Sequence, residues 1–269
     1  MPEAVNKVSK SAPIVYSCYY TRNHEGEQFV KEHVFSYQLT GTLFLNDGDK
    51  VHTFNPGDFR FCKRNSLVKF TKLPPAQGEF KSVSIYLDQE ALREIGMEYG
   101  YKADGPAADD VIVPLKSDIL YESYMNSLRP YEQLQQPGND KLLSLKMREA
   151  VLLLLQVNPE MKNVLFDFTD PGKIDLEAFM NRNFHFNVEL KRFAYLTGRS
   201  LATFKRDFEK IFHSSPSRWL QQRRLQEAHY LIKEKGAAPS EVYLELGFQD
   251  LSHFSFAFKK MYGKAPSRI

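Results

Sequence analysis

The sequence predicts an α+β protein built from two parts: a small antiparallel β-barrel or sandwich with appended helices, then an all-helical domain. Three observations predict this division. Short apolar alternations, separated by turns rich in Asn, Asp, Gly and Pro, fill residues 29–87, as in β-hairpins. After Lys173 the pattern changes to helical spacing with closely placed capping residues. The charge also changes sign, because residues 171–269 carry 17 Lys and Arg against 10 Asp and Glu, whereas residues 1–170 carry 19 against 23.

The length of 269 residues suits two domains, which we expect at residues 1–165 and 171–269, divided near the Pro171-Gly172 turn signal. With 42% hydrophobic and 26% charged residues, the composition excludes a disordered or fibrous chain. No apolar run approaches the roughly 20 residues that a membrane span needs, and the N-terminus lacks the apolar segment of a secretory signal. The sequence therefore predicts a cytoplasmic protein without a membrane partner.

The strands are expected within residues 29–87. Phe35, Tyr37 and Leu39 alternate with polar residues, which is typical of a half-buried strand. Further strands are predicted at residues 43–45, 51–54, 59–62, 67–71 and 80–87. Asp88 can then cap a short helix that ends between Gly96 and Gly100, and a loop follows.

Two longer helices are predicted at residues 117–135 and 140–156, where the apolar spacing is helical again. The second of them is apolar over more than one face, so it needs two partners. One partner is its own barrel. The other is either the same helix of a second chain or the C-terminal domain, and residues 117–156 are therefore a candidate homodimer interface.

The C-terminal domain begins with a predicted helix at residues 175–183. A second helix at 188–197, with Asn187 as its N-cap, ends at Gly198, and Ser200 caps a third at 201–212. Two helices joined by such a short turn form a helix-turn-helix unit. The small side chain of Ala194 allows these helices to cross closely.

The same arrangement recurs after a spacer helix that begins at Pro216 and ends at Gly236, about 30 Å long. Helices are predicted at residues 239–246 and 251–262, and Phe254 and Phe258 repeat the inward pair Phe204 and Phe208. Two recognition helices at this spacing match the roughly 34 Å between successive major-groove faces of B-DNA. The basic charge and this spacing favour duplex DNA over an anionic membrane surface as the partner.

A set of residues spread over about 95 positions carries a family resemblance: Pro216, Trp219, Leu220, Arg224, Leu225, Ala228, Leu231, Ile232, Gly247, Phe248, Ser252, Phe254, Phe258, Lys259, Lys260, Gly263, Pro266 and Arg268. They resemble the signature of the AraC/XylS family of bacterial transcription regulators. The turns at residues 41–43 and 56–58 are similar to those of that family's cupin-like domain. The resemblance implies a regulator, commonly an activator. Its N-terminal part senses a small molecule or protein effector or dimerises, and its C-terminal part binds promoter DNA for RNA polymerase.

The first recognition helix is expected to contact DNA through outward residues: Ala202, Thr203, Lys205, Arg206 and, just before the helix, Arg199. Arg206 stands at the family's base-reading arginine position, where an arginine can bond to guanine O6 and N7. The alternative is an ion pair within its own helix. Lys205 and Arg199 are predicted to hold phosphates, and Ala202 offers an apolar contact to a thymine methyl.

The second recognition helix departs from the family pattern. Ser252, His253 and Phe256 are predicted to lie outward, and Phe256 replaces a second base-reading arginine. Either Phe256 contacts a thymine methyl, or this unit reads little sequence and positions the protein through Ser252, Lys259 and Lys260. The sequence favours the second interpretation. In the spacer helix, Arg224 belongs to the family pattern and is expected to be structural, buried against a carboxylate.

Enzyme chemistry finds little support. A cupin metal site needs an HxH pair, whereas the first 170 residues hold only His24, His33 and His52, with wide spacing. Cys18 and Cys62 stand alone, and there is neither a Gly-rich phosphate loop nor a nucleophile elbow. The sequence therefore predicts no catalytic residue, metal or cofactor.

Five aromatic residues of the strands are candidates for an effector pocket: Tyr37, Phe44, Phe54, Phe59 and Phe61. Alternating aromatics in a barrel also occur as ordinary core residues. The sequence favours the core interpretation, keeps the pocket as the alternative, and does not identify the effector.

Overall fold

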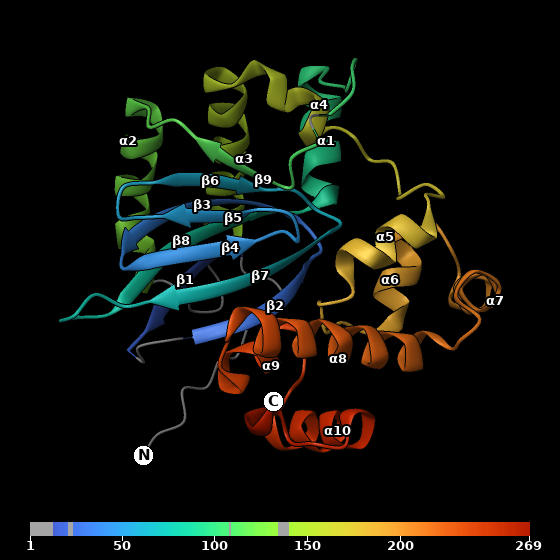
Figure 1. Ribbon diagram of the computed structural model, residues 1–269. Coiled ribbons are helices and arrows are strands. Elements are labelled where there is room, and N and C mark those ends of the chain that lie inside the picture. The colour runs from blue at the N-terminus through green and yellow to red at the C-terminus, as the bar shows by residue number, and fades with distance from the viewer. Residues whose placement is uncertain (1–12, 21–23, 108, 134–139) are drawn as a thin grey trace.

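The computed structural model describes residues 13–20, 24–107, 109–133 and 140–269 (Figure 1). Its strands form two antiparallel sheets, with the orders β1-β8-β3-β6-β9 and β2-β7-β4-β5. The bounds are β1 Ile14–Tyr19, β2 His24–Val30, β3 His33–Thr40, β4 Thr42–Asn46, β5 Val51–Phe54, β6 Phe59–Cys62, β7 Ser66–Leu73, β8 Phe80–Leu87 and β9 Ile112–Leu115. All six predicted strands are present, and together the two sheets form a flattened barrel.

The sequence did not predict β1 or β9 and caught only the end of β2. All three are edge strands: β1 pairs only with β8, β2 only with β7 and β9 only with β6. An edge strand tolerates polar residues and proline, because one side of it makes no ladder hydrogen bonds. Pro114 in β9 and the two glutamates of β2 therefore hid the strand pattern.

Helices cover one face of the five-stranded sheet. They are α1 Gln89–Tyr99, α2 Ile119–Leu128, α3 Asp140–Val157 and α4 Lys162–Leu165. Asp88 caps α1 by accepting from the amides of Glu90 and Ala91, and Gly100 ends it in the left-handed conformation, as predicted. The ring centroids of Phe35 in β3 and Tyr121 in α2 lie 5.1 Å apart, so aromatic side chains join this sheet to its helices.

One prediction about these helices needs correction, and one of two open alternatives is excluded. The helix expected over residues 117–135 ends at Leu128 and continues only as a 3-10 turn, Arg129–Gln133, which contains Pro130. The second apolar face of α3 does not meet the C-terminal domain, because α3 lies on the far side of the sheets from α7 to α10 (Figure 1). Leu142 and Leu145 remain exposed there, Leu145 to 61%.

The C-terminal helices are α5 Leu176–Asn183, α6 Leu190–Leu196, α7 Leu201–Phe212, α8 Pro216–Lys235, α9 Pro239–Glu245 and α10 Leu251–Tyr262. Asn187 is not the N-cap of the second helix, since α6 begins only after Glu189. Gly198 has a φ of +64°, and an added Cβ would lie 2.4 Å from the carbonyl carbon of Gly172. Only glycine fits that turn.

The α+β fold class is thereby confirmed: antiparallel sheets with appended helices precede a helical part with its own core. Phe204, Phe208, Phe254 and Phe258 are fully buried in that core, as predicted. Leu67 of β7 belongs to the same apolar cluster, so the four-stranded sheet packs against the C-terminal helices. In the described part of the chain, no helix has the length and apolar character to cross a membrane.

Candidate nucleic-acid interface

The first recognition helix, α7, has one fixed face and one exposed face. Ser200 caps it by accepting a hydrogen bond from the amide of Thr203 at 3.2 Å. Phe204 and Phe208 bury the inner face, with ring centroids 5.6 Å apart. The opposite face exposes Ala202, Lys205 and Arg206 and leaves Thr203 partly exposed. A rigid helix thus presents a basic face to solvent.

Arg199 does not belong to that exposed face, which corrects the prediction that it holds a phosphate. Its side chain is only 7% exposed. It donates to Asp207 Oδ2 at 3.2 Å and to the carbonyl oxygens of Thr197 and Ile174 at 2.7 and 3.0 Å. Arg199 therefore fixes the start of α7 onto the preceding turn. This ion pair also lowers the pKa of the Asp207 carboxyl.

Arg206 remains available to a ligand. Its side chain is 66% exposed, and its nearest anionic contact is Asp207 Oδ1 at 3.4 Å. The ion pair within the helix, which the sequence offered as the alternative role of Arg206, is therefore present. Arg206 shares the Asp207 carboxylate with Arg199, however. An exposed pair of this kind contributes little stability. The guanidinium can leave Asp207 at low cost and donate to a base edge.

The second recognition helix, α10, repeats this construction with a more apolar face. Asp250 caps it by accepting from the amide of His253 at 2.6 Å. Phe256 is 70% exposed, and the exposed face carries further apolar side chains at Leu251 and Met261. The other residues of α10 that were predicted to face DNA are also exposed: Ser252, His253, Lys259 and Lys260.

The spacer helix α8 is fixed to both units. Trp219 packs on Phe212, with ring centroids 4.5 Å apart. Arg224 donates to three main-chain carbonyls, those of Phe184, Phe186 and Gly247, at 2.7, 2.8 and 3.0 Å. Arg224 is structural, as expected, but carbonyl oxygens from two distant loops take the place of the expected carboxylate. It joins the segment before α6 to the turn after α9.

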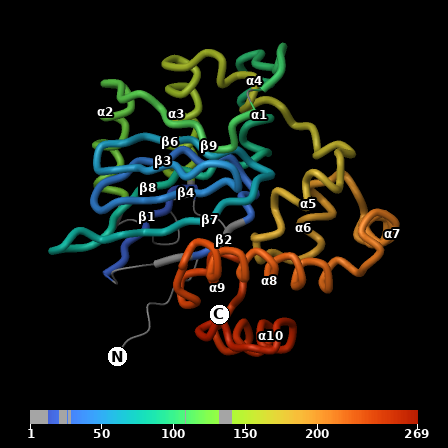
Figure 2. Tube along the Cα trace, in the orientation of Figure 1, coloured from blue at the N-terminus to red at the C-terminus, as the bar shows by residue number. Residues whose placement is uncertain are grey.

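The two recognition helices do not run parallel. Figure 1 shows α7 along its axis, as a ring of turns, whereas α10 lies across the view. The Cα trace of Figure 2 gives the same relation. Successive major-groove segments on one face of B-DNA run parallel, so two helices docked alike must be parallel as well. In this arrangement, only one of the two helix-turn-helix units at a time can place its recognition helix in the major groove.

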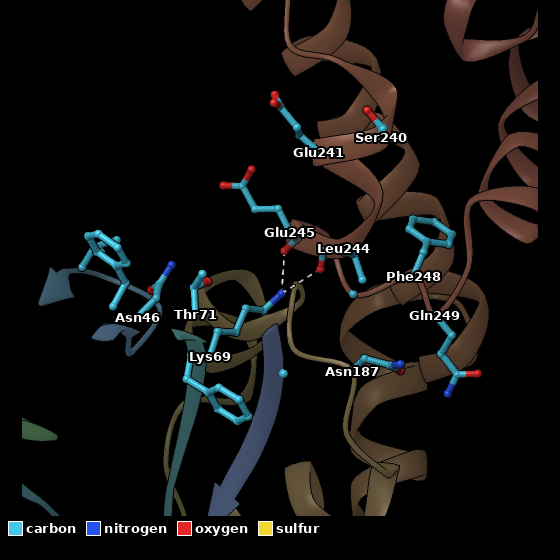
Figure 3. Close-up of a pocket in the computed structure, with 15 residues that line it drawn as sticks. Asn46, Lys69, Thr71, Asn187, Ser240, Glu241, Leu244, Glu245, Phe248 and Gln249 are labelled. Carbon is cyan, nitrogen blue, oxygen red and sulfur yellow. Dashed lines mark hydrogen bonds between the residues drawn. The ribbon is translucent and has the colours of Figure 1, made fainter. Parts of the chain in front are cut away.

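The barrel contacts both units. Lys69 in β7 donates from Nζ to the carbonyl oxygens of Leu244 and Glu245, at 3.4 and 2.5 Å, at the C-terminal end of α9 (Figure 3). A cation is favourable at that end of a helix. The guanidinium carbon of Arg192 in α6 lies 4.6 Å from the ring centroid of Phe29 in β2. No local sequence signal marks these contacts, because their partners are more than 160 residues apart.

A cavity of about 990 Å³ lies beside Lys69, between the outer face of the four-stranded sheet and α9. Phe44 lines it, together with Val51 from the neighbouring strand and Asn187 and Phe248 from the C-terminal part. The close-up in Figure 3 shows side chains from the sheet and from α9 facing this space.

The five aromatic candidates for an effector pocket do not share one cavity, and four of them lie in the core, as the favoured interpretation expects. Tyr37, Phe59 and Phe61 pack toward the helices that cover the five-stranded sheet. Phe54 lies in the core between the sheets, and Phe44 lines the outer cavity. Successive side chains of a strand point to opposite faces of the sheet. The five aromatic residues are therefore divided between different faces of the two sheets.

The histidines weighed as metal ligands lie in different layers. His33 stacks on Phe61 and accepts from the amide of Arg64 at 3.1 Å, and burial lowers its pKa to about 3. His52 lies 3.5 Å from Asp47 in the β4–β5 hairpin. The described residues include no group of three or more side chains suited to hold a metal ion.

Comparison with protein families matches both parts of the chain. A family described as a helix-turn-helix domain matches residues 193–269, and one described as the ExsA N-terminal regulatory domain matches residues 33–165. The chain is 25% identical to the HTH-type transcriptional regulator ExsA of Pseudomonas aeruginosa, over 86% of this chain and 83% of that protein. It is also 25% identical to the thermoregulatory protein LcrF of Yersinia pestis, over 86% of each chain.

A further curated relative is also a transcriptional regulator. The HTH-type transcriptional activator RhaS of Escherichia coli is 27% identical over 59% of this chain and 61% of its own length. Among solved structures, apo ToxT of Vibrio cholerae matches 95% of this chain and 96% of its own, at 12% identity and a TM-score of 0.45. The curated relatives are transcriptional regulators, not enzymes.

Proposed function

We propose that this chain, which belongs to the AraC/XylS family of DNA-binding transcriptional regulators, activates transcription. In this proposal it binds promoter DNA in two adjacent major grooves. In this proposal residues 1–165 form the regulatory domain and residues 171–269 the DNA-binding domain. The observation that best supports this proposal is the exposed basic face of α7, which the buried pair Phe204 and Phe208 holds rigid.

The residues of the two recognition helices have different roles in the proposal. Arg206 reads a guanine, because its exposed guanidinium can donate two parallel hydrogen bonds to O6 and N7. Lys205 holds a phosphate, and Thr203 and Ala202 contact the groove wall and a thymine methyl. In α10 the positioning contacts come from Ser252, His253, Lys259 and Lys260, with an apolar contact from Phe256.

Binding by both units requires one of them to turn until α7 and α10 are parallel. The contact of Lys69 with α9 joins the barrel to the second unit, so it must yield or shift during this rotation. A small-molecule or protein effector that acts on the barrel can therefore control access to DNA. RNA polymerase is the expected further partner, and the place of action is the cytoplasm, where promoter DNA and polymerase are found.

We also propose that the chain forms a homodimer through the helices at residues 117–156. Its support is the apolar surface of α2 and α3, where Ile119, Leu142 and Leu145 are exposed while Met147 and Val151 bury the other face. Exposed leucines clustered on one helix surface are typical of an interface.

The dimer is tested by Leu145→Glu, which places a charge in the proposed interface. At tens of micromolar we expect the wild type to have the mass of a dimer by light scattering and Leu145→Glu that of a monomer. Tyr230→Glu, at an exposed position of α8, is the matched control and should remain dimeric. A monomeric wild type would remove the dimer from the proposal.

The proposed function is tested by selecting bound duplexes from a random library with the full-length chain. We expect enrichment of an asymmetric site whose two halves lie about one helical turn apart. Its affinity should fall steeply as salt rises from about 50 to 200 mM, since each phosphate contact releases counterions. Equal, weak binding to every duplex, by both the full chain and residues 171–269, would contradict sequence-specific regulation.

A further inference from the structure

Asp207 is a carboxylate on the recognition helix α7, and one of its two oxygens is fixed by the fold. Arg199 donates from Nε to Asp207 Oδ2 at 3.2 Å. The Arg199 side chain is itself anchored, because its Nη1 donates to the carbonyl oxygens of Thr197 and Ile174. The hydrogen bond from Arg199 lowers the pKa of the Asp207 carboxyl, so this group is ionised at neutral pH. The carboxylate is therefore charged and held in one orientation.

The second oxygen of Asp207 contacts Arg206, since Asp207 Oδ1 lies 3.4 Å from Arg206 Nη2. Adjacent residues of a helix do not normally face each other, and helix geometry favours pairs three or four residues apart. Glu209 stands three residues after Arg206 and is exposed. In the described part of the chain, Arg206 nevertheless pairs with Asp207. The exposed guanidinium is thus drawn toward the one carboxylate that the fold holds in place.

A carboxylate at this position is unfavourable for affinity. DNA is a polyanion, and its binding depends largely on contacts between cations and phosphates. The Asp207 side chain is 17% exposed beside the face of α7 that is proposed to meet DNA, so its charge repels nearby phosphates. A residue that weakens all binding can still increase specificity, because specificity is a difference between affinities.

A guanidinium can keep this carboxylate and read a base at the same time. It has five N–H donors, two of which are on Nη2. One hydrogen of Arg206 Nη2 can stay on Asp207 Oδ1, while the other hydrogen and one of Nη1 meet O6 and N7 of guanine. The carboxylate restricts the rotation of the Arg206 side chain, so less conformational entropy is lost when the base binds. It also competes with phosphates for the guanidinium.

We infer that Asp207 is a specificity-determining residue, which orients Arg206 toward a guanine edge and keeps it from the phosphates. Arg199 is the positioning residue behind it, since Arg199 fixes the carboxylate to the turn before α7. The inference rests on the proposed function, in which Arg206 reads a base. Asp207 acts in it through Arg206, without a contact of its own to DNA.

The test compares the Kd of full-length variants for the selected duplex with the Kd for a duplex that lacks the guanine on which Arg206 acts. The ratio of the two values measures discrimination. Asp207→Asn should lower this ratio by about 2- to 12-fold, because the Arg206 side chain must then be ordered on binding. Binding to the mismatched duplex should stay equal or tighten, since a negative charge is removed.

Glu209→Gln is the matched control, because it removes the same charge from an exposed position of the same helix. It should keep the ratio of the wild type. Melting temperatures show whether each variant is folded during the titration. Asp207→Glu retains the charge opposite Arg199 but moves the carboxylate away from Arg206. It should also lower the ratio, and it replaces Asp207→Asn in the comparison if that variant does not fold.

A double variant separates positioning of Arg206 from support of the fold. If Asp207 acts through Arg206, adding Asp207→Asn to Arg206→Ala should leave the ratio unchanged. A wild-type ratio in Asp207→Asn, or an equal loss of the ratio with and without Arg206, would overturn the inference and leave the proposed function intact. If Arg206→Ala itself keeps the full ratio, base reading by Arg206 is wrong, and so is the inference.

Discussion

Arg206→Ala is expected to weaken binding to the selected DNA site by about 5- to 150-fold, because a bidentate arginine–guanine contact contributes about 1–3 kcal/mol. The loss should be confined to duplexes that carry the preferred base, so the selected site should lose information over one half. Folding should be unaffected, since the side chain is 66% exposed and pairs only weakly with Asp207. Fluorescence titration of wild type and variant against matched and mismatched duplexes measures both effects.

Lys205→Ala is the matched control for Arg206→Ala, because Lys205 is a neighbouring exposed cation on the same helix that is proposed to contact a phosphate instead of a base. It should weaken binding to all duplexes to a similar extent and reduce the salt dependence by about one phosphate contact. If Arg206→Ala behaves in this uniform way as well, Arg206 holds a phosphate, and base reading must come from other residues of α7.

Arg224→Met is expected to destabilise the protein by about 3 kcal/mol, because it leaves three main-chain carbonyls without their charged donor. For a chain of this size the melting temperature should fall by about 6–12 °C. DNA binding should weaken too, since Arg224 joins the loop before α6 to the turn after α9. Differential scanning calorimetry and duplex titration at a temperature where the variant is folded separate these effects.

Arg223→Met provides the comparison, since Arg223 is adjacent in α8 but forms a partly exposed pair with Glu227 at 3.0 Å. Its cost should stay below about 1 kcal/mol. Arg224→Lys should recover only part of the stability, because an ammonium cannot reach three carbonyls with the fixed fork of a guanidinium. Equal melting temperatures for Arg223→Met and Arg224→Met would refute the linking role of Arg224.

Much of the fold could be predicted because its signals are local. The caps Asp88 and Ser200 stand within three residues of the amides that they bond, and the spacing of Phe204 and Phe208 fixes the inner face of α7. Three of the four edge strands, β1, β2 and β9, gave no such signal, since the unpaired side of an edge strand relaxes the apolar alternation. The position of Arg199 also escaped prediction, because its partner carbonyl at Ile174 lies 25 residues earlier.

The sequence by itself determined most of the helices, the two helix-turn-helix units and the face of α7 that meets solvent, because each depends on spacing within one or two helical turns. It also determined the family, because the residues that carry the resemblance stand at fixed positions along the chain. Only the tertiary structure decided how distant segments meet. It joined Lys69 to α9, gave Arg224 its three carbonyls and set the recognition helices crosswise. These contacts join residues that lie far apart along the chain, so no spacing within a few helical turns reveals them.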